Sequence, residues 1–155
     1  MKKLILVLVA VMGLTFAANA QDNALGVRLG GGQGYNAEIS FQKGLGGTSR
    51  LEFDLGYHNW EDAGAFSLAA LYQMHQEFAS VQNLGWYVGA GAKLNYYSGG
   101  GSSALALGVL GQAGLDYHFN AVPLQLSLDI RPCFYVLPST AFHWGDIALG
   151  IRYMF

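Results

Sequence analysis

Apolar and polar side chains alternate along most of the chain after residue 20. The run 50–58 reads RLEFDLGYH, with an aliphatic or aromatic residue at every odd position, and the run 124–131, LQLSLDIR, repeats the pattern. Successive side chains of a β-strand point to opposite faces, so a period of two predicts strands with one apolar and one polar face. The pattern places no charge on the apolar face of any predicted strand.

Turn residues divide the chain into about eight such runs. Glycine-rich or proline-containing segments lie at 31–34, 44–48, 98–102 and 120–123. The predicted strands are residues 24–30, 35–43, 49–60, 66–78, 85–97, 104–119, 124–136 and 145–155. Pro132 cannot donate a ladder hydrogen bond and predicts a bulge near the end of the seventh strand. We predict an all-β fold, an eight-stranded antiparallel up-and-down transmembrane β-barrel.

Composition indicates which face of this barrel points inward. A soluble ligand-binding barrel would show the same alternation with its apolar face inside. Only 12% of the residues are charged, against roughly 25% in a typical soluble domain, and 52% are hydrophobic. Turning the charged face toward lipid would cost roughly 2–4 kcal/mol for each Arg or Lys near the midplane. The polar face therefore lines the lumen, and the apolar face meets lipid.

Residues 1–20 have the features of a cleaved N-terminal signal peptide. Lys2 and Lys3 precede an apolar run over residues 4–11, and Ala18-Asn19-Ala20 matches a small-residue cleavage site before Gln21. The predicted mature barrel, residues 21–155, then has six basic and ten acidic residues, which excludes a basic footprint for nucleic acid. Cys133 is the one cysteine, so no intramolecular disulfide can form.

Aromatic residues fall toward both ends of the predicted strands, as in the two girdles of a membrane barrel. An even number of strands places both mature termini in the periplasm. The predicted external belt contains Tyr35, Tyr57, Phe66, Tyr96, Phe134 and Trp144. The predicted periplasmic belt contains Phe41, Phe78, Trp86, Tyr117, Phe119, Tyr153 and Phe155.

The last third of the chain resembles a known class. Residues 145–155, GDIALGIRYMF, look like the C-terminal signal read by the outer-membrane assembly machinery, with Tyr153 and Phe155 as its aromatic positions. Residues 114–119 and 122–132 are similar to small OmpA- and OmpX-like barrels of the Bacteroidetes-type outer membrane protein β-barrel family. The resemblance implies an outer-membrane location, with lipid, lipopolysaccharide and that machinery as partners. We expect a monomer without cofactors.

The lumen-facing charges are predicted to form a structural salt-bridge network. Its members are Arg28, Glu38, Arg50, Glu52, Asp54, Lys93, Asp116, Asp129, Arg131 and Arg152. Hairpin register places Arg28 near Glu38, and Asp129 near Arg152. Buried ions cost several kcal/mol each unless they are paired, and an eight-stranded interior is just wide enough for side chains to fill. A packed network is therefore favoured over a conduit, with a narrow pore as the alternative.

Three histidines, His58, His75 and His118, also take lumen parity and raise the question of a metal. His58 and His75 fall at opposite ends of one predicted hairpin, so hydrogen-bonded lumen histidines are expected in place of a metal site.

A lipid A-modifying enzyme would need a serine, a histidine base and an orienting group at the external rim. The rim candidates are Ser139, His143, His58, Glu61 and Asp62. The His-x-Ser pattern of the deacylases is absent from the chain, so no catalytic residue is predicted. The leading expectation is a non-enzymatic integral outer-membrane protein with a structural or surface-interaction role. Short predicted external connections, such as 60–65 and 137–143, weaken a host-binding role, and a soluble periplasmic barrel is the outside alternative.

Overall fold

The computed structural model describes residues 23–31, 35–60, 63–99, 102–145 and 147–155. The predicted signal peptide lies outside them. Within the described part of the chain, no helix is long and apolar enough to cross a membrane. The strands are β1 (Asn23–Gly31), β2 (Tyr35–Gly44), β3 (Ser49–Trp60), β4 (Ala63–Glu77), β5 (Leu84–Gly99), β6 (Ser102–His118), β7 (Leu124–Ile130), β8 (Cys133–Leu137), β9 (Ala141–His143) and β10 (Ile147–Met154).

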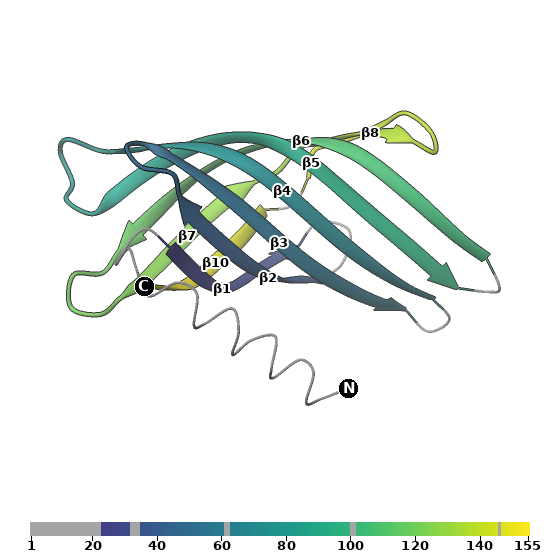
Figure 1. The fold of residues 1–155 in the computed structure, drawn as a ribbon, viewed down its shortest axis with the longest axis horizontal. Helices are drawn as coiled ribbons and strands as arrows, with labels where there is room; N and C mark the ends of the chain where they lie inside the picture. The colour runs from purple at the N-terminus through teal and green to yellow at the C-terminus, as the bar shows by residue number, and fades with distance from the viewer. Residues whose placement is uncertain (1–22, 32–34, 61–62, 100–101, 146) are drawn as a thin grey trace.

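Eight of these ten strands form a closed barrel, and these eight are called its staves. The order β5-β4-β3-β2-β1-β10-β7-β6 returns to its start through the β5–β6 pairing. Past the end of β7, β8 pairs with β6, and β9 has β8 as its one partner among the described strands. These two short strands therefore prolong one part of the barrel wall. All the pairings are antiparallel. The predicted all-β, eight-stranded antiparallel barrel is confirmed (Figure 1).

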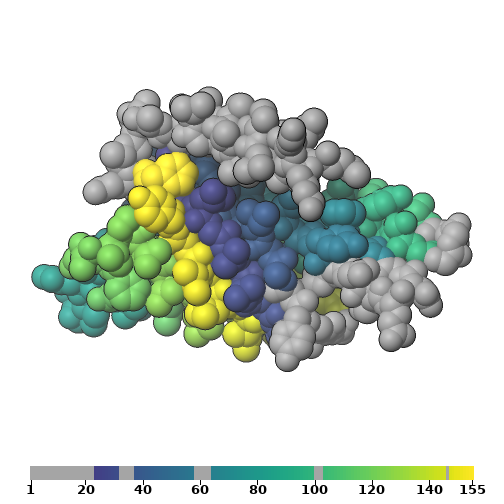
Figure 2. Space-filling view, turned by 90° about the horizontal axis from the view of Figure 1, so that it is seen from below, coloured from purple at the N-terminus to yellow at the C-terminus, as the bar shows by residue number. Residues whose placement is uncertain are grey.

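The first and last strands of the chain are neighbours in the barrel. β1 pairs with β10 from Ala24–Met154 to Gly31–Ile147. In Figure 2 the yellow C-terminal strand lies directly beside the purple N-terminal strand. The Phe155 N–H donates to the Asn23 carbonyl at 2.9 Å, which continues this pairing to the end of the chain.

The predicted seventh strand, residues 124–136, is interrupted. β7 ends at Ile130 and β8 begins at Cys133, so Arg131 and Pro132 stand outside both strands, at the place predicted to bulge. The Pro132 carbonyl still accepts a 2.9 Å hydrogen bond from the Gly111 N–H of β6. The predicted external connection 137–143 instead contains β9, which turns back along β8.

The start of the last strand also differs from the prediction, since β10 begins at Ile147 and not at residue 145. Gly145 has a φ of +81°, and an added Cβ would lie 1.5 Å from the Arg131 carbonyl oxygen. Only glycine fits this close approach of two backbone segments.

The two faces of the wall are inverted relative to a water-soluble barrel. Large apolar side chains stand outside, with Ile39, Leu55 and Ile147 exposed by 58%, 52% and 62%. Polar side chains fill the inside, beside a small apolar cluster of Ala69, Leu71, Leu110 and Cys133. The predicted orientation is correct.

One charge breaks the predicted segregation. Lys43 shares the outward parity of Ile39 and Phe41 and is exposed at the end of β2, so the statement that no charge lies on an apolar face is wrong there. A lysine at a strand end can extend its ammonium group into water while its stem lies along apolar surface.

Cross-strand rows account for part of the aromatic pattern. Tyr57 of β3 pairs with Phe66 of β4, which pairs with Tyr96 of β5, and all three side chains are exposed. At the opposite end, the Tyr117 and Phe119 rings meet edge-on at 5.0 Å. Of the predicted belt members, the side chain of Tyr35 lies outside the described part of the structure.

Candidate functional site: the lumen charge network

Glu52 is the centre of the polar lumen and its side chain is fully buried. Two guanidinium groups and three amides point at it. Its partners are Arg152 at 3.3 Å, Arg131, Gln42, Gln73 at 3.0 Å and Gln112 at 3.4 Å. Because Gln73 also bonds Gln112 at 2.6 Å, side chains of β3, β4 and β6 meet across the lumen.

Arg131 lies in the break between β7 and β8 and links four carboxylates. Its guanidinium contacts Asp54 at 2.7 Å, Glu38 at 3.4 Å, Asp129 at 3.8 Å, and Glu52. The side chain is 5% exposed. The break that Pro132 predicts therefore also positions Arg131, which contacts more carboxylates than any other basic residue of the network.

Arg28 forms a second bridge between acidic groups of different strands. It lies 3.0 Å from Glu38 and 2.7 Å from Asp129. The Arg28–Glu38 proximity expected from hairpin register is present, since the two residues are direct partners of β1 and β2. The Tyr87 hydroxyl donates to Asp129 at 3.1 Å, and Lys93 lies 3.9 Å from Glu38.

The predicted proximity of Asp129 to Arg152 is wrong. In the β7–β10 register Asp129 faces Ala148, four positions before Arg152. The Arg152 guanidinium instead donates to Ser40 at 2.9 Å and Ser127 at 2.7 Å, besides pairing with Glu52. β8 and β9 lie between β7 and β10 in the chain, so these two strands are not joined by a simple hairpin. The register predicted from such a hairpin is therefore wrong.

All ten residues of the predicted network point into the lumen. Five are basic and five are acidic, so the set is formally neutral. Nine have buried side chains, and Lys93 is 18% exposed. Opposite charges at ion-pair distance offset the desolvation of buried ions, which is the physical condition for keeping so many of them inside a narrow barrel.

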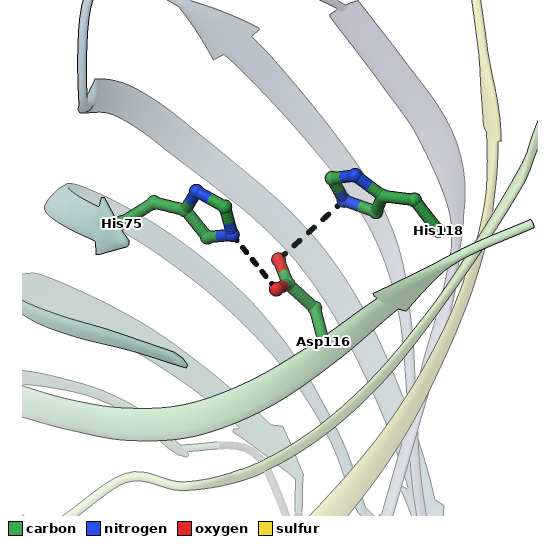
Figure 3. Close-up of side chains that lie close together, drawn as sticks. All are labelled: His75, Asp116 and His118. Atoms are coloured by element: carbon green, nitrogen blue, oxygen red, sulfur yellow. Dashed lines mark hydrogen bonds and ion pairs between the residues drawn. The ribbon is translucent and has the colours of Figure 1, made fainter. Parts of the chain in front are cut away.

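Asp116 organises a cluster near the barrel end that carries the C-terminus, and Arg50 and Gln73 connect this cluster to Glu52. One oxygen, Oδ2, accepts from Arg50 at 2.8 Å and Gln125 at 2.9 Å. The other, Oδ1, lies 2.9 Å from His75 Nε2, and His118 Nε2 lies 3.7 Å from Oδ2 (Figure 3). The two imidazole rings are nearly parallel, with centroids 5.8 Å apart. Sequence reasoning missed this cluster because it compared His75 with His58, whose side chain lies outside the described structure.

Gly85 makes the His75–Asp116 contact possible. His75 and Asp116 lie on β4 and β6, and β5 runs between them. A Cβ at Gly85 would lie 2.2 Å from His75 Nε2 and 2.6 Å from Asp116 Oδ1. The missing side chain on the middle strand lets the outer two meet, and a glycine between two lumen-facing ionisable residues is the signal that could have indicated this.

A cavity of about 130 Å³ opens beside this cluster. It is lined by residues from seven strands and from the turn after β2, including Gln42, Thr48, Arg50, His75, His118 and Gln125. The Arg50 guanidinium also lies 4.5 Å from the centre of the Tyr87 ring. The mouth of the barrel thus combines imidazoles, amides and a guanidinium around a small open space, with the Asp116 carboxylate bonded to that guanidinium.

The other predicted sites are placed as follows. Tyr153 points outward and is 55% exposed, while Phe155 pairs through its backbone with Asn23. At the far end, Ser139 is exposed in the β8–β9 turn, and His143 packs edge-on against Tyr135 at 5.4 Å. Glu61 and Asp62 lie outside the described residues.

The closed barrel with inward charges has the architecture of bacterial outer-membrane barrels. Neither a protein-family model nor a curated protein matches the sequence. Solved structures do match, among them two from bacteria. One is the N-terminal β-barrel domain of Pseudomonas aeruginosa OprF, with a TM-score of 0.69 and 16% identity over 88% of this chain and 100% of that one.

The other is Neisserial surface protein A, with a TM-score of 0.61 and 17% identity over 86% of this chain and 94% of that one. At these identities the likeness shows a shared fold. It supports the predicted fold class, and it assigns no role to individual residues of this chain.

Proposed function

We propose that this protein is an integral outer-membrane β-barrel with a structural or surface-interaction role and without catalytic activity. The inverted wall carries the proposal: Leu55 is 52% exposed on the outside of β3, while its neighbours Glu52 and Asp54 are 0% and 1% exposed inside. Such a surface is stable in lipid, where apolar side chains meet acyl chains and each of the eight strands of the ring is paired on both sides.

Outer-membrane lipid and lipopolysaccharide are the proposed surroundings. The row Tyr57–Phe66–Tyr96 and the pair Tyr117–Phe119 stand near opposite ends of the long staves. Amphipathic aromatic rings favour the two membrane interfaces. Both mature termini would then face the periplasm, since β1 starts beside the end of β10. A monomer is sufficient, because the ring of eight staves closes within one chain.

A structural role is favoured over conduction. The guanidinium groups of Arg28, Arg131 and Arg152 cross the lumen to carboxylates on other strands. Side chains this closely paired leave little continuous space for hydrated ions. In planar bilayers the folded protein is expected to show no stable channel openings, and reproducible unitary conductance would make the narrow pore the better proposal.

Membrane fractionation tests the location. The untagged full chain is expressed in a Gram-negative host, and its envelope is separated on a density gradient and then washed with urea. The protein is expected in the dense outer-membrane fraction and in the urea-resistant pellet. Recovery in the soluble periplasmic fraction would contradict the proposal and favour a soluble barrel.

A further inference from the structure

We propose that His75, Asp116 and His118 form a binding site for a divalent transition-metal ion at the barrel mouth near the C-terminus. A ligand atom from each of the three residues lies within 4.8 Å of the other two (Figure 3). Two imidazole nitrogens and one carboxylate oxygen are a donor set suited to Zn²⁺, Cu²⁺ or Ni²⁺, and a hard cation such as Mg²⁺ prefers oxygen donors alone.

The Asp116 carboxylate is already oriented for this role. Arg50 and Gln125 both donate to Oδ2, which fixes the plane of the carboxylate. The other oxygen, Oδ1, faces His75 Nε2 at 2.9 Å. Outer-shell hydrogen bonds of this kind hold metal ligands in place, so Oδ2 is anchored while Oδ1 is directed at the His75 imidazole.

His118 supplies the observation that hydrogen bonding alone does not explain. Its Nε2 atom is buried, and among the described residues it has no hydrogen-bond partner, because the 3.7 Å to Asp116 Oδ2 is too long for one. Buried polar atoms are nearly always satisfied by a protein group, water or an ion. A metal held by His75 and Asp116 would satisfy this nitrogen.

The site has room to close around an ion. Ligand atoms of a tetrahedral site stand about 3.3 Å apart for bonds of about 2.0 Å. The three ligand atoms lie within 4.8 Å of one another, so the widest pair must approach by at most about 1.5 Å. His118 is 30% exposed at the end of β6, and the cavity of about 130 Å³ lies beside it. The same cavity leaves space for water to complete the coordination.

Arg50 limits the affinity. Its guanidinium lies 2.8 Å from Asp116, so the carboxylate charge is already balanced before a cation binds. The site has three protein ligands and a nearby positive charge, and we expect it to bind more weakly than a closed four-ligand structural zinc site.

Calorimetry with zinc sulfate tests the site on the untagged protein folded in detergent. His75→Gln and His118→Gln each remove one ligand, and His143→Gln at the opposite end of the barrel is the matched control. Losing an outer-shell partner lowers metal affinity roughly 10–100-fold, so losing a ligand is expected to lower it by about tenfold or more. The His143→Gln protein should bind as the wild type does.

Copper gives an independent readout on the wild-type protein, which does not depend on the folding of a variant. The electron paramagnetic resonance spectrum of bound Cu²⁺ is expected to show coupling to imidazole nitrogens. A spectrum without that coupling, or zinc binding that persists unchanged in both ligand variants, would overturn the site. The barrel proposal is judged separately, by membrane fractionation without added metal, so either proposal can fail alone.

Discussion

The Arg28 guanidinium lies 2.7 Å from the Asp129 carboxylate, although the two residues are 101 positions apart. They belong to β1 and β7, and β10 runs between these strands. The contact therefore links β1 to β7 across β10, the last strand of the chain. Ion pairs of this kind hold together strands that are far apart in the sequence.

Replacing Glu52 with Gln should destabilise the barrel strongly. The substitution removes the carboxylate shared by Arg131 and Arg152 and leaves both guanidinium groups short of negative charge in a buried site. Removing one partner of a buried ion pair costs about 3–5 kcal/mol. Urea unfolding in lipid vesicles measures the loss, with Glu77→Gln at the exposed end of β4 as the control, expected within about 0.5 kcal/mol of wild type. Equal stability of the two variants would count against the role of the network.

A charge placed on the outer wall should lower the stability of the barrel in a membrane, whereas a charge placed in a turn should have little effect. Leu149 is 45% exposed on β10, between Leu29 and Leu128 of the neighbouring strands. Leu149→Arg is expected to lower the free energy of unfolding in vesicles by about 2–4 kcal/mol. Val122→Arg in the β6–β7 turn, where the side chain is 44% exposed, should cost about 0–1 kcal/mol. If Leu149→Arg were as harmless as the turn variant, the outer face would not be in lipid.

Gly114→Ala should disturb the lumen through overpacking. The added methyl group would lie 2.6 Å from a Tyr87 ring carbon and 2.7 Å from the Asp129 Cβ. Overpacking of a filled interior costs about 1–3 kcal/mol. Gly31→Ala, whose Cβ would have no atom within 4 Å, is the matched control. Thermal unfolding should separate the two variants, and a wild-type midpoint for Gly114→Ala would show that Tyr87 can move without cost.

Phe155→Ala tests the predicted assembly signal apart from stability. The backbone hydrogen bonds between Phe155 and Asn23 do not involve the ring, so refolding in detergent should be nearly unaffected. The yield in the outer membrane should fall severalfold if the terminal ring is read during assembly. Normal yield in cells would remove the evidence for a signal at this position.

The period of two was sufficient to predict the fold and the lumen face. In residues 50–58, parity alone separates Glu52 and Asp54 inside from Phe53 and Leu55 outside, because a strand offers each side chain only two directions. The short connection between β1 and β2 likewise makes the Arg28–Glu38 register readable.

Contacts beyond adjacent hairpins were not readable in the same way. The Arg152–Glu52 pair joins β10 to β3, and the His75–Asp116 pair reaches across β5. Such contacts depend on barrel closure and on where small residues leave space, which alternation does not encode. Asp129 and Arg152 were wrongly paired because residues 131–146 contain an additional hairpin.

Heat-modifiability of the outer-membrane fraction tests the closed membrane barrel most directly. The protein is run on a denaturing gel with and without boiling, and a hydrogen-bonded ring without free edges should keep the unboiled form compact in detergent. The account predicts two positions on the gel, with the unboiled band converting to the slower unfolded one on heating. A single position on the gel with and without boiling would contradict it.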